Sequence, residues 1–400
     1  MKQLKELNKL YILFFFYSFP ILTYVYELIH TQSNSLSIAL RAITLIYAIF
    51  LVYFNFSKRR FYTSIDFWLF LGFWIAYTPR IIYDTTFNTH YLGQKPIDYI
   101  LFGLMLGFFS SLPFFNKFKV DESKLEQNIY FITALLCVCG LLYALSSEKL
   151  FIDRVRGNHK LNELSFSIIA ATLMIISVKR IFMKGVVFLW KPIAFLTLVL
   201  GIGCLLISGS KSPMLCFLIF LLLFIFQSLK ASPIKVLIMF CLALSLIIYI
   251  IIQFDLFFMF EILTRRISHF SSDQSTLARN RSLSGAWSQF LDSPFIGSFI
   301  EEKMTRQYPH NMVLEAFMAL GILGGLLFFV LYLRFAVRTF LLSWRTQFSI
   351  IPVLAMLHFV VSLSSGSLGF DYEFWASFAL IASYGKQIND NNSENQILVN

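Results

Sequence analysis

Long apolar runs, repeated along the whole chain, most constrain how this sequence can fold. A run of about 20 apolar residues matches the roughly 30 Å hydrocarbon core of a bilayer, and an α-helix satisfies its own backbone groups while crossing it. Such runs lie at about 10–30, 36–56, 66–83, 97–116, 129–146, 162–179, 186–207, 213–229, 234–254, 312–333, 347–364 and 371–385. The sequence therefore predicts an all-α, polytopic integral membrane protein with about 12 transmembrane helices.

The composition excludes an ordinary soluble domain. Hydrophobic residues make up 58% of the sequence and charged residues only 14%, where about 25% charged residues is usual in soluble domains. All five cysteines fall inside apolar runs, where a thiol acts as a small hydrophobic group. The chain has no HExxH, GxSxG or P-loop pattern and no Cys/His cluster. We therefore expect neither a metal site nor a cofactor.

The first apolar run follows Lys2, Lys5 and Lys9, as the core of a signal peptide would. It is too long for one and lacks a small-x-small cleavage site, so we expect a retained membrane anchor. Residues 1–385 are then expected to form a single transmembrane domain, with 255–311 as a long extracytoplasmic loop. The polar residues 386–400 are expected to form a flexible cytoplasmic tail.

Basic residues set the expected orientation. With both termini in the cytoplasm, most basic clusters fall on the cytoplasmic side, as the positive-inside rule requires. These residues are Lys58, Arg59, Arg60, Lys117, Lys119, Lys124, Lys179, Arg180, Lys184, Lys230, Lys235, Arg334, Arg338 and Arg345. The formal net charge of +11 follows largely from this topology, so nucleic acid is not an expected partner.

Three connections expected on the outer side are basic as well. The connection between the runs 129–146 and 162–179 contains Lys149, Arg154, Arg156 and Lys160, and the one between 186–207 and 213–229 contains Lys211. The long loop contains Arg265, Arg266, Arg279, Arg281, Lys303 and Arg306. Asn162, the pair Ser212-Pro213 and Asn311 stand where the following helices begin and can cap them. Helix starts and arginines favour phosphate, so we expect a composite anion site. The alternative is that these loops are simply solvated.

An amphipathic helix is expected within the long loop. Leu283, Trp287, Phe290 and Leu291 follow helical spacing, and Asp292-Ser293-Pro294 ends the pattern. Arg279 falls on the same face as Leu283 and Trp287 and Arg281 does not. Arg279 is therefore expected either to extend toward water along the apolar face or to bind a phosphate.

The stretch "PHNMVLEAFMALGILGG" (309–325) opens the next apolar run. His310 and Asn311 stand at the expected helix start, where an anion is stabilised, although a loop histidine without a ligand is the alternative. Glu315 lies about one turn inside, where an ionisable group is costly and is expected to be functional or to hold an arginine. Gly321 and Gly325 form a GxxxG pair, which is typical of close helix packing.

Four segments in this order resemble the O-antigen polymerase and O-antigen ligase family of bacterial envelope glycosyltransferases. They are "RVRGNHKLNELS" (154–165), "ISGSKSPML" (207–215), "LARNRSLSGAWSQFLDSPFIG" (277–297) and the His-Asn segment above. The resemblance implies an active site containing Arg156, Lys211, Arg279 and His310. This chain has Lys211 where many members have arginine, and only Gly297 of a usual glycine pair after Pro294. Arg281 is an alternative to Arg279.

The resemblance implies transfer of a glycan carried on undecaprenyl pyrophosphate at the outer face of the bacterial inner membrane. Arg154, Arg156, Lys211, Arg281 and Asn311 are then expected to bind the pyrophosphate, and Arg279, His310 and Glu315 to act in catalysis. Cationic side chains would stabilise the leaving pyrophosphate. His310 would contact phosphate or deprotonate the attacking sugar hydroxyl, with Glu301, Glu302 and Glu163 as alternative bases.

A polymerase, which extends another lipid-linked repeat unit, is favoured over a ligase, which transfers the glycan to lipid A-core. Membrane lipid and a chain-length regulator are further expected partners. A flippase for lipid-linked oligosaccharide is the alternative of another class, and Arg41 and Arg80 are its main candidate residues inside the membrane. A purely structural protein would leave the basic outer loops unexplained.

Overall fold

A computed structural model describes residues 2–29, 35–57, 64–116, 120–146, 156–182, 190–229 and 274–397. In this part of the chain the regular elements are all helices, which confirms the all-α prediction. They are α1 (Lys2–Ile29), α2 (Ser35–Ser57), α3 (Ile65–Phe87), η1 (Thr89–Tyr91), α4 (Pro96–Asp98), η2 (Tyr99–Phe108), η3 (Phe109–Phe115), α5 (Glu122–Ser146), α6 (Glu163–Phe182), α7 (Trp190–Ser208), α8 (Lys211–Leu229), α11 (Gln274–Asp292), α12 (Met312–Arg345), α13 (Ile350–Ser365) and α14 (Tyr372–Ile397).

Eight helices within the described ranges are long and apolar enough to cross a bilayer, so the protein is a multi-pass membrane protein. They are α1, α2, α3, the continuous segment Pro96–Phe115, α5, α6, α7 and α12. Lys211–Gln227 and Ile350–Ser365 are apolar but shorter. The run expected at 234–254 lies outside the described residues. The total of about 12 spans and the orientation therefore stay predictions.

Two helices continue beyond the apolar runs that begin them, and the flexible tail stays a prediction. α12 continues to Arg345, beyond the apolar run that begins it. α14 continues as a helix to Ile397, through most of the segment expected to be a flexible tail.

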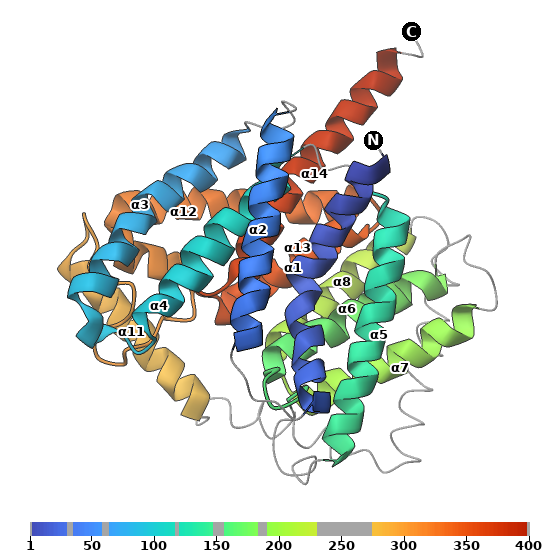
Figure 1. The fold of residues 1–400 in the computed structure, drawn as a ribbon, viewed down its shortest axis with the longest axis horizontal. Coiled ribbons are helices and arrows are strands. Elements are labelled where there is room, and N and C mark those ends of the chain that lie inside the picture. The colour runs from blue at the N-terminus through green and yellow to red at the C-terminus, as the bar shows by residue number, and fades with distance from the viewer. Residues whose placement is uncertain are drawn as a thin grey trace.

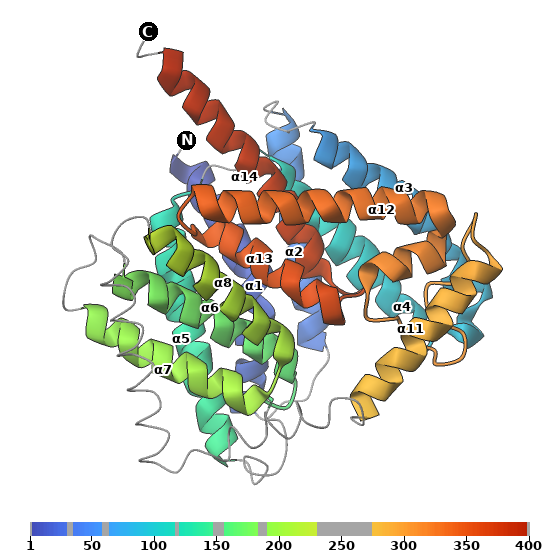
Figure 2. The ribbon, with the colours of Figure 1, turned by 180° about the vertical axis from the view of Figure 1, so that it is seen from behind.

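The helices form two groups, and a third set of helices lies between them. α5, α6, α7 and α8 lie together on one side, while α3, α4 and α11 lie on the other (Figures 1 and 2). α12 begins beside α11 and runs across to the end of α8, where Gln227 Nε2 donates to the Trp344 carbonyl oxygen at 2.8 Å. α1, α2 and α13 pass between the groups, and the two termini lie at the same end of the molecule. α11 lies away from that end.

Aromatic packing fixes α3 against α12 and α14. Phe73 and Trp74 of α3 are fully buried, with ring centroids 5.1 and 5.0 Å from that of Trp375 in α14. Phe328 of α12 lies 5.1 Å from Phe73. Because large aromatic side chains pack with little freedom in a dense interior, this cluster holds the part of α12 that follows Gly321 at a fixed place beside α3.

Ion pairs to a buried carboxylate join the same helices near one of their ends. Arg334 and Arg338 of α12 both bind the carboxylate of Asp66 in α3, and the Arg334 Nε to Asp66 Oδ1 distance is 2.7 Å. A buried carboxylate needs such partners, since an unpaired charge away from water is costly. These two arginines belong to the set that the positive-inside rule assigns to the cytoplasmic side.

The segment before α6 is tied to α1. The Asn158 side-chain amide donates to Thr23 Oγ1 at 2.8 Å, and the Tyr24 hydroxyl donates to the Gly157 carbonyl oxygen at 3.0 Å. Asn162 Oδ1 accepts the Ser165 N–H at 2.8 Å, which confirms the expected cap of α6. The start of α6 therefore lies level with residues 23–24 of α1.

Candidate active site

A break in α12 organises the region around His310. Gly321 has φ 67° and ψ −164°, which are not helical values, so the chain changes direction there. The break exposes backbone groups that the loop after α11 uses: Ser298 N donates to the Met318 carbonyl at 2.8 Å and Ile322 N donates to the Pro294 carbonyl at 2.7 Å. The loop therefore pairs with the broken helix on both sides of Gly321.

Two glycines make this contact possible. A Cβ built on Gly297, which has φ 75°, would stand 2.4 Å from the backbone of Ala319, and one on Gly321 would stand 2.4 Å from that of Phe295. Both the left-handed conformation and the close approach exclude a side chain. The GxxxG pair was expected to pack against another helix, but Gly321 packs against a loop. The nearest neighbour of a Cβ on Gly325 would be Phe317 of the same helix.

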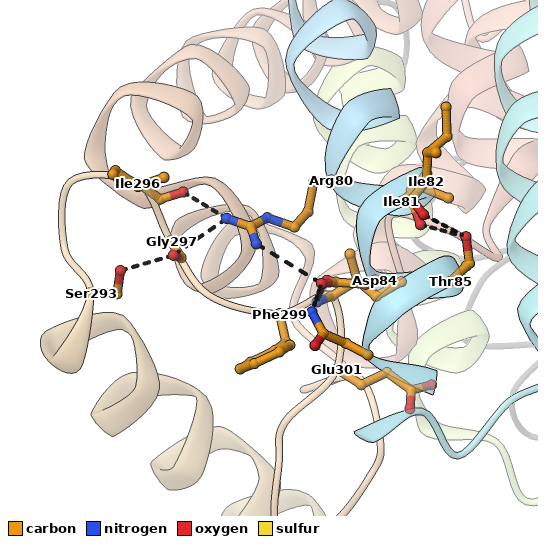
Figure 3. A network of polar contacts seen from close by, with 12 residues as sticks. Arg80, Ile81, Ile82, Asp84, Thr85, Ser293, Ile296, Gly297, Phe299 and Glu301 are labelled. Carbon is orange, nitrogen blue, oxygen red and sulfur yellow. Dashed lines mark hydrogen bonds and ion pairs between the residues drawn. The ribbon is translucent and has the colours of Figure 1, made fainter. Parts of the chain in front are cut away.

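α3 holds the other side of this loop (Figure 3). Arg80 donates to the carbonyl oxygens of Ile296 and Gly297 at 3.2 and 3.4 Å, and Asp84 Oδ2 accepts the Ile300 N–H at 3.0 Å. Asp84 is fully buried, and its Oδ1 lies 3.9 Å from the Arg80 guanidinium. Arg80 thus binds the loop backbone. This structural role gives no support to the flippase alternative, in which Arg80 would line a transport path.

A second buried carboxylate lies at Glu301. It accepts hydrogen bonds from the Tyr99 hydroxyl and the Gly93 backbone N–H. Burial raises the pKa of Glu301, and those two donors partly oppose the shift. Glu302 instead binds its own loop, accepting from Met304 N at 2.9 Å and Thr305 N at 2.6 Å. Of these two alternative bases, Glu302 is engaged locally and Glu301 is buried beside Tyr99.

His310 ends this loop in a strained conformation. Its φ is 55°, which is uncommon for a residue other than glycine, and Asn311 Oδ1 caps α12 by accepting the Leu314 N–H at 3.0 Å. The cap expected at Asn311 is confirmed. The His310 ring packs edge-on against Tyr308, with 4.6 Å between centroids. Within the described residues its buried Nδ1 has no hydrogen-bond partner.

The His310 ring is neutral near pH 7. Burial lowers the pKa of His310 to about 4, and the nearby positive charge of Arg279 adds to the shift. Arg279 is half-buried on α11. Burial raises the pKa of Tyr308, and the positive charge of Arg279 opposes that rise. Arg281 is exposed. The structure therefore places Arg279 near His310 and Tyr308.

Glu315 binds the turn that joins α13 and α14. It is fully buried and accepts from Ser367 Oγ at 3.2 Å and Leu368 N at 3.1 Å. No arginine forms an ion pair with Glu315 in the part of the chain that the structure describes. Glu315 thus holds a backbone turn next to the start of α12.

Lys211 begins α8 rather than preceding it. The helix starts at Lys211, so Ser212 lies in the first turn and hydrogen-bonds to Ser364 near the end of α13 instead of capping α8 as expected. Ser364 lies in the last turn of α13, and Ser367, which binds Glu315, follows three residues later in the connection to α14. The starts of α8 and α12 are therefore linked through the end of α13.

Arg156 lies apart from this group. Its Nε donates to Glu163 Oε1 at 3.1 Å and its side chain is 60% exposed, so Glu163 is engaged at the start of α6. Arg154 lies outside the described residues. The structure thus gathers His310, Asn311 and Glu315 around the start of α12, where the positive charge of Arg279 acts on the His310 ring, and it links Lys211 to them through α13. Among the described residues, neither Arg156 nor the exposed Arg281 shows such an interaction with His310.

The sequence patterns do not indicate several residues that shape this region. Asp84, Tyr99, Tyr308 and Ser367 hold or surround the loop and the start of α12. One signal was available for the first: Arg80 and Asp84 stand four residues apart in an apolar run, the spacing of a helical ion pair. The others act through contacts between distant segments.

The described residues define a multi-pass helical membrane protein in which His310 stands directly before the start of α12 and the positive charge of Arg279, on α11, acts on its ring. Residues 196–329, about a third of the chain, match the family model described as O-Antigen ligase. The resemblance to the O-antigen polymerase and ligase family is thereby confirmed over a stretch that contains Lys211, Arg279 and His310. No curated protein matches the chain.

Proposed function

We propose that this protein is a glycosyltransferase of the bacterial inner membrane that elongates a surface polysaccharide. It takes a glycan from undecaprenyl pyrophosphate at the outer membrane face and transfers it to another lipid-linked repeat unit. The observation that carries the proposal is the family match over the segment that contains both Arg279 of α11 and His310 at the start of α12.

The chemistry required fits the residues gathered there. Breaking the bond between the sugar C1 and the pyrophosphate oxygen leaves negative charge on the pyrophosphate, which a guanidinium and the free N–H groups of a helix start stabilise. Arg279 and the first turn of α12 take this role, with Lys211 as a further cation. His310, neutral at pH 7, orients the acceptor hydroxyl and accepts its proton.

A ligase that transfers the glycan to lipid A-core is the second candidate, because the matched family model is described as a ligase. The test is deletion of the gene in its host, followed by sizing of the surface glycan and identification of its anchor. Single repeat units on the final anchor support a polymerase, and long chains left on the lipid carrier support a ligase. Repeat units trapped at the cytoplasmic face would indicate a flippase, and an unchanged glycan would refute the proposal.

We further propose that the reaction needs no metal ion, since cationic side chains neutralise the leaving pyrophosphate. Transfer by the purified protein should therefore persist within about twofold in EDTA, because these charges do the work that Mg²⁺ performs in other phosphate chemistry. Adding back Mg²⁺ is the control. A loss in EDTA that Mg²⁺ restores would contradict this part of the proposal.

A further inference from the structure

A cavity lies apart from the residues gathered around His310. It has a volume of about 350 Å³ and is bounded by α1, α2, η2, α6, α13 and α14, within the range of about 300–1,000 Å³ that is typical of ligand pockets. None of His310, Arg279 and Glu315 lines it. Phe370 connects the two regions, because it lines the cavity and its ring lies 5.9 Å from that of Tyr308.

One end of the cavity is polar and basic. Lys160 and Asn162 line it at the start of α6, together with Arg41 of α2. The Arg41 guanidinium stacks 4.2 Å from the Phe102 ring centroid, and the Lys160 ammonium lies 4.2 Å from that of Tyr26. Neither cation forms an ion pair with a carboxylate among the residues that the structure describes. This end therefore offers two cations beside a helix start, a combination that favours an anion.

The other end is apolar and lies deeper along the helices. Phe15 and Phe16 line it about 14 residues before the end of α1, which at 1.5 Å per residue is about 20 Å from that end. Leu354 lines it from α13, about 16 Å before Ser365. Residues 23–24 of α1 lie level with the loop that carries Lys160, and Phe15 and Phe16 lie about two turns earlier in α1. The cavity therefore extends from a basic end near this loop to an apolar end deeper along α1.

His358 and Glu373 are two further polar side chains that line the cavity. His358 of α13 is 6% exposed, packs against Phe16, and forms no hydrogen bond within the described ranges. Glu373, at the start of α14, is the carboxylate among the lining residues. A carboxylate and an imidazole suit the hydroxyl groups of a sugar, while the two cations leave the lining with a net positive charge.

We propose that this cavity binds the acceptor: an amphiphile with a phosphate-bearing, glycosylated head and a long hydrocarbon chain, separate from the donor held at His310. Arg41 and Lys160 bind the phosphate, and the chain starts down toward Phe16 and Leu354 before it leaves for the bilayer. The proposal rests on the proposed function and deepens it. The reacting hydroxyl of such an acceptor lies at the far end of its glycan, so its phosphate need not lie near His310.

A second site for a lipid phosphate has a consequence for the reaction. A polymerase must hold two lipid-linked glycans at once, whereas a ligase holds one with a different acceptor. Occupation of both sites by the same carrier therefore favours polymerisation.

Native mass spectrometry of the full-length protein in detergent, titrated with undecaprenyl pyrophosphate, tests the proposal. The wild-type chain should bind two molecules. The Arg41→Gln/Lys160→Gln double variant should bind one, with apparent affinity for the second lowered at least tenfold. Arg279→Ala should also bind one, through loss of the other site. Lys95→Gln, which removes an exposed cation outside both regions, should bind two. Size-exclusion profiles matching the wild type show that each variant is folded.

The outcomes separate the two proposals. If the double variant still binds two molecules, or the wild type only one, the acceptor site is refuted while the proposed function stands. If Arg279→Ala still binds two, the donor site of the proposed function is wrong. If phosphatidylglycerol displaces the second molecule as well as undecaprenyl pyrophosphate does, the cavity is an ordinary anionic-lipid site and the acceptor proposal is refuted.

Discussion

Two arginines stand two residues apart on α11, and their surroundings differ. Arg279 is half-buried and close enough to His310 to lower its pKa, whereas Arg281 is exposed. We expect Arg279→Ala to lower kcat/KM at least about 100-fold, the usual effect of removing a group that stabilises charge in the transition state. Arg281→Ala should change it less than about fivefold. Transfer assays at matched protein abundance measure both, and the reverse order would move the site by two residues.

The pKa of His310 makes a prediction about pH. A neutral histidine is the active form of a base, and with a pKa of about 4 His310 stays neutral well below pH 6. An ordinary histidine, with a pKa of about 6.5, would lose about nine-tenths of its neutral form at pH 5.5. We therefore expect kcat/KM, which reports the free enzyme, to lose less than half its value to His310 protonation between pH 7.5 and pH 5.5.

Comparison with His310→Gln isolates this contribution, because protonation of the substrate affects both proteins alike. The ratio of wild-type to His310→Gln activity should stay constant down to pH 5.5. A ratio that falls tenfold over that interval would show that His310 titrates as an exposed histidine does, and would argue against the buried, neutral ring.

Local features at this scale were predictable from sequence, and tertiary ones were not. The caps at Asn162 and Asn311 follow from side chains that bond their own backbone three residues on. Ser212 was expected to cap α8, but it bonds to Ser364, a contact between segments far apart in the chain. Such a partner leaves no trace in the residues that flank Ser212.

Among the elements, α12 depends on a loop for its shape. The break at Gly321 is stabilised because backbone groups of residues 294 and 298 replace lost helical hydrogen bonds. The sequence indicated glycines and close packing here, but a GxxxG pattern predicts a second helix as partner. The positive φ values of Gly297 and Gly321 show that backbone freedom is the property used.

Gly297→Ala should therefore destabilise this region. A Cβ there would meet Ala319 backbone at 2.4 Å, in a left-handed conformation that costs roughly 1–2 kcal/mol for other residues. We expect a lower melting temperature in detergent and at least tenfold lower transfer activity. Gly203→Ala in α7 is the matched control, since a Cβ there has no neighbour within 4 Å. Unchanged stability and activity in Gly297→Ala would show that the loop contact is not needed.

Across the whole molecule, the site depends on residues outside the segment that matches the family. Hydropathy was enough to predict an all-helical membrane chain, because each apolar run carries its own signal. The pairing of α3 with the loop 293–311 joins positions more than 200 residues apart. Hydropathy places both near a membrane surface but contains no information about which helices become neighbours.

The Asp84 contact is the clearest test of this dependence. Asp84→Ala removes the acceptor for Ile300 N and leaves Arg80 without its carboxylate, and an unpaired buried group costs about 1–3 kcal/mol. We expect faster proteolysis within 293–311 and a drop of about tenfold or more in transfer at equal abundance. Asp84→Asn should recover part of both, because its amide oxygen can accept the same N–H.

Thr85→Val is the matched control for this experiment. Thr85 is the next residue on α3, and among the described residues its hydroxyl donates only to carbonyl oxygens of its own helix, at Ile81 and Ile82 (Figure 3). Its removal should leave proteolysis and transfer near wild-type values. If Asp84→Ala and Thr85→Val behave alike, α3 does not position the loop. The loop that Asp84 holds ends at His310. If Asp84→Ala alone exposes this loop, then α3, in the first third of the chain, determines the position of His310.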